Sequence, residues 1–233
     1  MIAEGRISVN GEVVTQLGTK VNPRRDVIQV DGRPLQRTER PVYLLLNKPR
    51  GVLSAARDAR GRRTVVDLVG HGSRLYPVGR LDLDSEGLIL LTNDGALALR
   101  LAHPRYEHEK EYRVLVAGRV GQEALERLRA GINLEGGRAR PVRVEVEGLA
   151  GADTWLRIVL KEGRKRQVRR MLEAVGNPVR RLIRVRMGPL HLGDLKPGAH
   201  RALSGRELRA IRGVRQQEPT RLRRRRKRGQ RRA

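Results

Sequence analysis

The sequence contains no cysteine, no phenylalanine and no long apolar run. Without cysteine the chain can form neither disulfides nor thiolate metal sites, which suits a reducing compartment, and we expect a cytoplasmic protein. No stretch reaches the roughly 18 apolar residues of a membrane span. The N-terminus also lacks the apolar core of a signal peptide. We therefore expect no membrane partner.

Aromatic residues and cofactor motifs are also scarce. The four tyrosines and one tryptophan are too few for an RNA-binding sheet that stacks several bases on aromatic rings. There is no GxxxxGK[ST] or GxGxxG loop for a nucleotide, no GxSxG nucleophile motif, and the five histidines show no zinc-ligand spacing. We expect no metal and no cofactor, and therefore chemistry that side chains carry alone.

Positive charge is the most abundant feature. Lys and Arg number 51 against 25 acidic residues, a net charge of +26. Residues 219–233 carry nine basic side chains and no acidic one, and subtracting them still leaves +17. Because neutralised phosphates release condensed counterions, such a chain favours a polyanion. Nucleic acid is the leading candidate partner.

Pattern changes along the chain predict four segments. Residues 1–36 contain short strands with hairpin signals at Asn10-Gly11 and Asp31-Gly32. Residues 37–41 form a polar linker, residues 42–212 alternate strands and helices, and residues 213–233 are too rich in arginine to fold alone. The expected fold class is α+β, with a mostly antiparallel or mixed central sheet and flanking helices.

One loop combines charged groups with apolar flanks. Residues 79–87, GRLDLDSEG, place two aspartates, a glutamate and an arginine between apolar strands, where functional groups are commonly held on a rigid scaffold. From spacing alone, a solvated turn is the simpler interpretation.

Four ordered blocks change that interpretation. They are YLLLNKP (43–49), VGRLDLDSEGLILLTNDG (78–95), KEYRV (110–114) and EGRKRQVRRM (162–171). Together they resemble the RsuA/RluB family of rRNA pseudouridine synthases over about residues 42–212, and most closely its RluB-type large-subunit enzymes. The resemblance implies the pseudouridine synthase fold. Residues 3–21 resemble the second half of an S4 RNA-binding domain, which leaves open whether the natural start lies upstream of Met1.

The resemblance also implies roles for particular residues. Asp82 matches the family's nucleophile, with Asp84 as a weaker rival. Tyr112 matches the tyrosine that stacks on the target base after the nucleotide leaves its helix. Arg169 matches the arginine that pairs with the nucleophile and keeps it ionised, with its neighbour Arg170 as the rival.

A second set of residues is expected to contact RNA. Positions 161–186 hold ten basic and two acidic residues, an imbalance suited to gripping phosphates. Arg80 precedes the nucleophile at a position suited to entering the RNA, and Leu182 matches the apolar residue beneath the base. The predicted RNA-binding residues are Arg80, Arg164, Lys165, Arg166, Gln167, Arg170 and Leu182.

The implied reaction isomerises uridine to pseudouridine, breaking the N1–C1′ bond and joining C5 to C1′. It loses no atoms and needs no redox partner. The carboxylate either attacks C1′ or removes the C2′ proton, and the sequence leaves both routes open. Ribosomal RNA, in particular 23S rRNA, is the expected partner of a monomeric enzyme. Two alternatives remain, a non-enzymatic rRNA-binding or ribosome-assembly protein and a synthase acting on tRNA or small-subunit rRNA.

Overall fold

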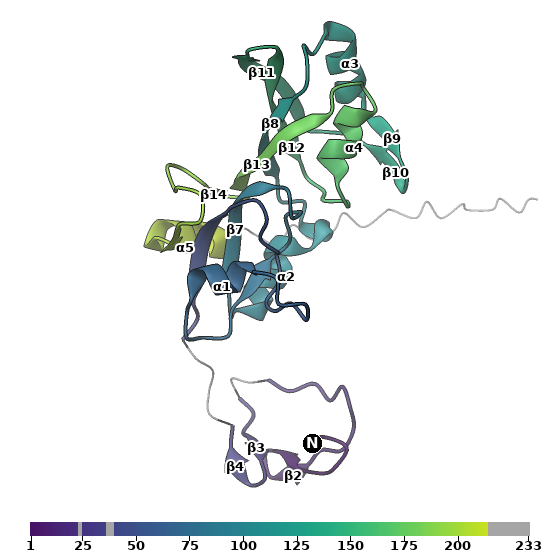
Figure 1. Cartoon of the computed structure of the whole chain (residues 1–233). Coiled ribbons are helices and arrows are strands. Elements are labelled where there is room, and N and C mark those ends of the chain that lie inside the picture. The colour runs from purple at the N-terminus through teal and green to yellow at the C-terminus, as the bar shows by residue number, and fades with distance from the viewer. Residues whose placement is uncertain (23–24, 36–39, 214–233) are drawn as a thin grey trace, which may run out of the picture. The chain divides into compact units, whose positions relative to one another are not determined.

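A computed structural model describes residues 1–22, 25–35 and 40–213 of the 233-residue chain (Figure 1). Most of the predicted 37–41 linker and all but the first residue of the predicted 213–233 tail lie outside these residues. The chain divides into two compact units, Met1–Pro41 and Val42–Ala233.

The first unit is a small antiparallel sheet. It contains β1 (Ile7–Val9), β2 (Glu12–Val13), β3 (Ile28–Val30) and β4 (Arg33–Pro34), in the order β2-β1-β3-β4. Both hairpin turns have two consecutive residues with positive φ, Asn10 (53°) with Gly11 (91°) and Asp31 (50°) with Gly32 (72°). A type I′ turn requires this conformation, so the two predicted hairpins are confirmed. The described part of this unit has no helix, and its S4-like character remains a prediction.

The second unit is built on a nine-stranded sheet. Its main path runs β11-β12-β8-β13-β7-β5-β15, with β14 paired to β13 and β6 paired to β7. Every pairing is antiparallel except that of β7 with β13, which confirms the predicted mixed sheet. The strands are β5 (Tyr43–Lys48), β6 (Tyr76–Val78), β7 (Glu86–Thr92), β8 (Lys110–Val116), β11 (Arg143–Ala150), β12 (Asp153–Leu160), β13 (Val179–Met187), β14 (Leu190–His191) and β15 (His200–Ala202). A separate hairpin joins β9 (Ile132–Leu134) and β10 (Gly137–Ala139).

Short helices flank the sheet. They are α1 (Val65–Val69), α2 (Gly95–Ala102), α3 (Gln122–Ala130), α4 (Gln167–Glu173) and α5 (Gly205–Gly213), with one 3₁₀ turn at Pro104–Tyr106. In Figure 1, α1 and α2 lie near β5–β7, whereas α3 and α4 lie near β8–β13. None of the described helices is long and apolar enough to cross a membrane.

The local signals explain most helix ends. Asp94 begins α2 by accepting a hydrogen bond from the Leu97 amide at 3.0 Å, as an N-cap residue does. A serine followed three residues later by a glutamate predicts a capping box, and Ser204 and Glu207 form one before α5. The spacing of apolar residues over 164–176 predicts a helix that starts at Arg164. In the structure α4 begins only at Gln167, because Arg166 adopts the left-handed conformation (φ 51°) and keeps residues 164–166 in a loop.

The two antiparallel parts of the sheet meet at the parallel β7–β13 pair. One apolar cluster lies under β8, β12 and β13, and two others lie on the two faces of β5 and β7. At the junction Gly87 has φ +105°, and a Cβ there would lie 2.3 Å from the backbone oxygen of Arg184. Glycine is therefore required for β7 and β13 to approach so closely.

Candidate active site

A cavity of about 580 Å³ opens beside this junction. Its wall is formed by the loop before β7, the end of α2, the start of β8, the loop before α4 and the middle of β13. Eight of the ten predicted catalytic and RNA-binding residues line it. The eight are Arg80, Asp82, Tyr112, Arg164, Lys165, Arg166, Gln167 and Leu182. Arg169 and Arg170 lie outside its lining.

The backbone on both sides of Asp82 is held in place. The Ser54 hydroxyl donates to the Leu81 carbonyl at 2.8 Å and accepts from the Leu81 amide at 3.0 Å. On the other side the Gly51 amide donates to the Leu83 carbonyl at 2.8 Å. These bonds fix where the Asp82 side chain enters the cavity, as a preorganised site requires.

Lys48 supports the same loop from below. It is fully buried, and its ammonium donates to the carbonyls of Pro49 (2.9 Å), Leu83 (3.4 Å) and Ser85 (2.7 Å). Burial lowers the pKa of Lys48 to about 8, against the opposing effect of the nearby carboxylates of Asp84, Glu86 and Asp82. Lys48 therefore acts as a buried anchor of the Asp82 loop.

Asp82 and Asp84 differ in their contacts. The Asp84 carboxylate is paired with Arg166 at 3.2 Å and with Arg169 at 3.3 Å. Asp82 is half-buried and lines the cavity, and its carboxylate has no hydrogen bond or ion pair with any described residue. A carboxylate held by two arginines is a poor nucleophile, whereas an unpaired one is available for reaction.

The predicted ion pair of Arg169 with Asp82 is not formed in the structure. The Arg169 guanidinium contacts the Asp84 carboxylate, the Asp84 carbonyl at 3.1 Å and the Ser85 hydroxyl at 3.3 Å. The reason is that α4 places this side chain against the turn after Asp82. Burial lowers the pKa of Arg169, and Asp84 opposes that effect more than Asp82 does. Arg169 thus holds the turn that follows Asp82.

Tyr112 and Leu182 lie where an apolar surface meets the cavity. Both are buried, both line the cavity and both belong to the apolar cluster under β8, β12 and β13. Tyr112 is therefore both an aromatic residue of the core and part of the cavity wall. A flat ring beside an apolar side chain suits contact with a planar base.

Besides Arg166, which pairs with Asp84, three of the predicted RNA-binding side chains already bond to other residues of the protein. Arg164 donates to the Gly136 and Gly137 carbonyls at 2.9 and 2.7 Å and pairs with Glu162. The Gln167 amide is buried, bonded to Glu162 at 2.6 Å and to the Arg164 amide at 3.0 Å. These contacts tie the loop before α4 to the β9–β10 hairpin. Arg170 pairs with the exposed Glu135 at 3.6 Å.

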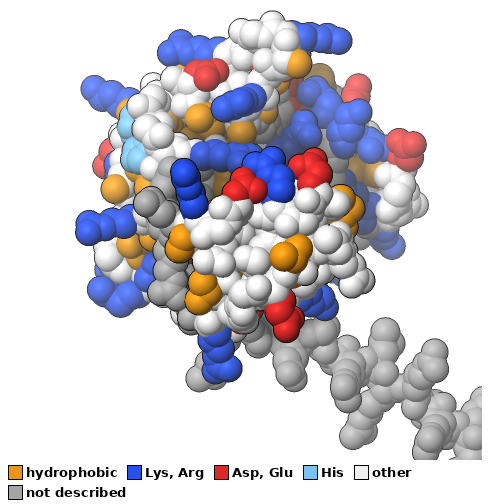
Figure 2. Space-filling model, turned by 90° about the horizontal axis from the view of Figure 1, so that it is seen from below, with side chains coloured by type: hydrophobic (Ala, Val, Ile, Leu, Met, Phe, Trp, Pro, Cys, Tyr) orange, Lys and Arg blue, Asp and Glu red, His pale blue; other side chains and the backbone are white. Residues whose placement is uncertain are grey.

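Two cations at the cavity remain available to a ligand. Arg80 and Lys165 are exposed, line the cavity and have no hydrogen bond or ion pair with any described residue. On the face drawn in Figure 2, Lys and Arg side chains are spread widely and acidic ones are sparse. Such surfaces attract the phosphates of a nucleic acid.

The sequence interpretation did not assign Lys110 or Arg184 to the site, yet both line the cavity. Burial lowers the pKa of both, and for Lys110 the nearby Arg184 adds to the effect. A signal existed for Arg184, because residues two apart on a strand share a face and Leu182 had been assigned. Among the described residues, no group of three or more His, Cys, Asp or Glu could hold a metal ion.

This arrangement can be compared with known proteins. A profile of the family described as RNA pseudouridylate synthase matches residues 42–174. The chain belongs to the RNA pseudouridine synthases. This pseudouridine synthase is 47% identical over 210 residues to an RNA pseudouridine synthase of Aquifex aeolicus, covering 89% of the chain and 84% of the relative. It is 44% identical over 217 residues to the ribosomal large subunit pseudouridine synthase B of Bacillus subtilis, covering 92% and 88%.

The fold agrees with that family. A crystal structure of a pseudouridylate synthase superposes with a TM-score of 0.67 at 30% identity, covering 90% of each chain. The predicted fold and enzyme class are thereby confirmed. The interpretation as a non-enzymatic RNA-binding protein gives way to that of an enzyme.

Proposed function

We propose that this pseudouridine synthase isomerises one uridine of large-subunit ribosomal RNA, with Asp82 as the reacting carboxylate. The single observation that carries the assignment is the unpaired Asp82 carboxylate in the cavity, beside an Asp84 that two arginines hold. The substrate class is supported by the 44% identity to the Bacillus subtilis enzyme, whose name specifies the ribosomal large subunit.

The side chains of the cavity divide the work of the reaction. The target nucleotide leaves the RNA helix, and its base enters the cavity between Tyr112 and Leu182. Arg80 and Lys165 contact the phosphate backbone of the RNA. Asp82 then attacks C1′ or removes the C2′ proton. By the first route the N1–C1′ bond breaks as Asp82 bonds to C1′, and the Asp82–C1′ bond breaks when C5 bonds to C1′. By the second route the N1–C1′ bond breaks as the C2′ proton leaves, and Asp82 returns that proton to C2′ when C5 bonds to C1′. In both routes the C5 proton then leaves and N1 gains a proton, so that atoms and charge balance.

The other parts of the chain have proposed roles in binding. We assign residues 1–36 to an S4-like RNA-binding module, 37–41 to a linker, 42–212 to the catalytic domain and 213–233 to a basic segment that holds RNA through its nine arginines and lysines at 219–233. A synthase acting on tRNA or small-subunit rRNA is the alternative that the experiment below separates.

The test is a carbodiimide and primer-extension map of pseudouridine in rRNA from cells with and without this gene. One large-subunit stop should vanish on deletion and return with wild type and with Asp84→Asn at reduced level, but not with Asp82→Asn. Asp84→Asn is the matched control, since it removes one charge from the same loop. Restoration by Asp82→Asn would refute the assignment of the nucleophile. A changed stop only in tRNA or small-subunit rRNA would refute the substrate class.

A further inference from the structure

Arg184, in the middle of β13, is a buried cation without a carboxylate partner. It is 2% exposed and lines the cavity. Its Nε donates to the Leu88 carbonyl at 2.8 Å, whereas its Nη2 is buried and has no hydrogen-bond partner among the described residues. A buried guanidinium without a carboxylate partner destabilises the fold, so its retention at a cavity wall points to a ligand.

The direction of this side chain follows from a β-bulge. The pairing of β13 with β8 shifts register between Arg184 and Arg186, so Arg184 lies opposite Tyr112 whereas Arg186 lies opposite Glu111. Consecutive residues of β8 point to opposite faces of the sheet. Arg184 is therefore on the cavity side with Tyr112, and Arg186 is on the other side, where it pairs with Glu109 and Glu111. Bulges commonly re-aim side chains next to active sites.

The reaction supplies an acceptor for this donor. When the N1–C1′ bond breaks, the pyrimidine departs with the electron pair, and its negative charge spreads from N1 to the carbonyl oxygens. This happens by either route open to Asp82. We propose that Arg184 donates to a pyrimidine carbonyl and stabilises the uracil anion between bond cleavage and C5–C1′ bond formation. The inference rests on the proposed function of Asp82.

The depth of Arg184 favours the base over a phosphate as its ligand. Among the described residues, the exposed cations of the cavity without a partner are Arg80 and Lys165, and these are accessible to an RNA backbone that stays outside. Arg184 lies beside Tyr112, the residue that meets the base. Lys110, whose ammonium donates to the His108 carbonyl at 3.1 Å, adds a second positive charge near Arg184. A donor preorganised at developing charge is worth about 10²–10³ in rate.

The experiment compares two leaving groups under single-turnover conditions with saturating RNA. The substrates are one RNA carrying uridine at the target and the same RNA carrying 5-fluorouridine there. Fluorine makes the departing pyrimidine a weaker base, so its cleavage depends less on a stabilising cation. Disappearance of the N1-linked nucleoside from nuclease digests reports cleavage for both, although fluorine blocks the final proton loss from C5. The enzymes are wild type, Arg184→Met, Arg184→Lys and Arg180→Met, the last removing an exposed arginine of the same strand.

Arg184→Met should lower the cleavage rate of the uridine substrate by about 100-fold. It should lower the cleavage rate of the 5-fluorouridine substrate by at most about 10-fold. Arg184→Lys should cleave uridine faster than Arg184→Met does, because it keeps a cation at this position. It also provides the test if the methionine variant does not fold. Arg180→Met should slow the cleavage of both substrates equally or not at all.

Equal slowing of both substrates by the Arg184 variants would overturn the proposal. An effect of these variants on RNA affinity alone would also overturn it, because it would indicate a phosphate contact. If Asp82→Asn cleaves uridine normally, the proposed function itself fails; if only the leaving-group difference is absent, this inference fails alone.

Discussion

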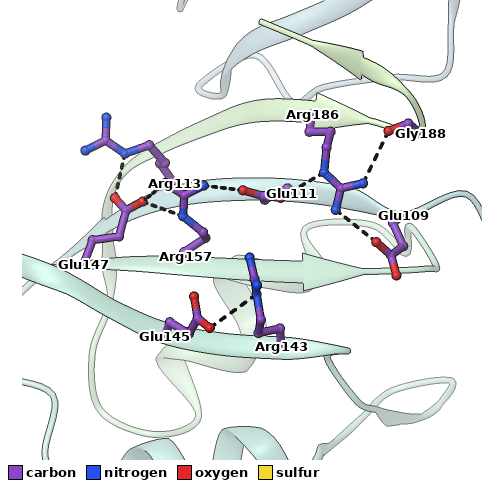
Figure 3. A network of polar contacts seen from close by, with 9 residues as sticks. All are labelled: Glu109, Glu111, Arg113, Arg143, Glu145, Glu147, Arg157, Arg186 and Gly188. Atoms are coloured by element: carbon purple, nitrogen blue, oxygen red, sulfur yellow. Dashed lines mark hydrogen bonds and ion pairs between the residues drawn. The ribbon is translucent and has the colours of Figure 1, made fainter. Parts of the chain in front are cut away.

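The two faces of the sheet formed by β8, β12 and β13 carry the same kinds of charged residue in opposite arrangements. On one face arginines and glutamates alternate in a connected network (Figure 3). Glu111 accepts from Arg157 at 2.5 Å and from Arg186 at 2.9 Å, and Glu147 accepts from Arg113 at 2.7 Å and also from Arg157. Each of these charges has a partner. We call this set, with Glu109, Arg143 and Glu145, the ion-pair face.

On the cavity face the charges are separated. Arg184 and Lys110 lack carboxylate partners among the described residues, and the Asp82 carboxylate lacks cationic ones. Pairing satisfies a charge within the fold and stabilises it, whereas leaving it unpaired costs stability and keeps it available to substrate. The comparison teaches that in this arginine-rich chain the partner of a charge, and not its presence, distinguishes the ion-pair face from the cavity face.

The largest effect on stability and on the reaction rate is expected from replacing Lys48. This residue tests the comparison because it is a buried cation whose hydrogen-bond acceptors are backbone carbonyls and not carboxylates. Replacing it in Lys48→Met removes the donor of three loop carbonyls and should lower the free energy of unfolding by about 2–3 kcal/mol. The resulting shift of Asp82 should reduce the single-turnover rate by about 100-fold. Denaturant unfolding and rate measurements check both effects, with the exposed Lys196→Met as control. A stable, fully active Lys48→Met would show that the anchor is dispensable.

Removing a carboxylate from the ion-pair face should lower the free energy of unfolding and leave the reaction rate nearly unchanged. Glu111→Gln leaves Arg157 and Arg186 without their shared carboxylate, and the free energy of unfolding should fall by about 2 kcal/mol because the carboxylate is buried and the arginines are partly exposed. The rate at saturating RNA should stay within about twofold, since nothing at the cavity changes. The exposed pair Arg143–Glu145 (3.5 Å) supplies the control, with Glu145→Gln costing at most about 0.5 kcal/mol. A large loss of rate in Glu111→Gln would mean that the two faces are coupled.

The pairing of Glu207 with Arg201 should make the stability of the protein depend on pH. Arg201 holds the pKa of Glu207 at about 2, below its ordinary value of 4.5. Because the folded-state pKa is depressed, the stabilisation is present above pH 4.5 and is lost as the pH falls toward 2. Glu207→Gln should therefore be less stable than wild type by about 1 kcal/mol at neutral pH. Thermal unfolding of both proteins should show this gap closing with acidification, and a constant gap would contradict the pairing.

The smallest effect on the reaction is expected from removing residues 219–233. The rate at saturating RNA should change by less than about twofold, because the cavity keeps its charges. The dependence of RNA affinity on salt should flatten, with the log–log slope changing by up to about 6, roughly 0.7 for each of nine lost cations. Filter binding across a salt series checks this, and the modified uridine should be the same. An unchanged slope would show that these residues do not contact phosphate.

Much of the fold could be read from local patterns. The apolar run at 43–48 and the alternation at 154–160 are typical of strands and correspond to β5 and β12. Asp94 and Ser204 are typical N-cap residues and do begin helices. These signals can be read from the sequence because they act between near neighbours. The start of α4 could not be read, since a left-handed Arg166 has no sequence signature. The helix α1 and the β9–β10 hairpin were also missed because their short segments carry little periodicity.

The sequence by itself determined the family, the mixed sheet and the candidate carboxylates, because ordered motifs and hydrophobic periodicity are local properties of the chain. Only the tertiary structure decided which charges have partners. Arg169 contacts Asp84 because α4 lies against the turn after Asp82, and Arg184 faces the cavity because a bulge in β13 separates it from Arg186. Such pairings depend on the packing of segments far apart in sequence, and a β-bulge changes the face to which a residue belongs.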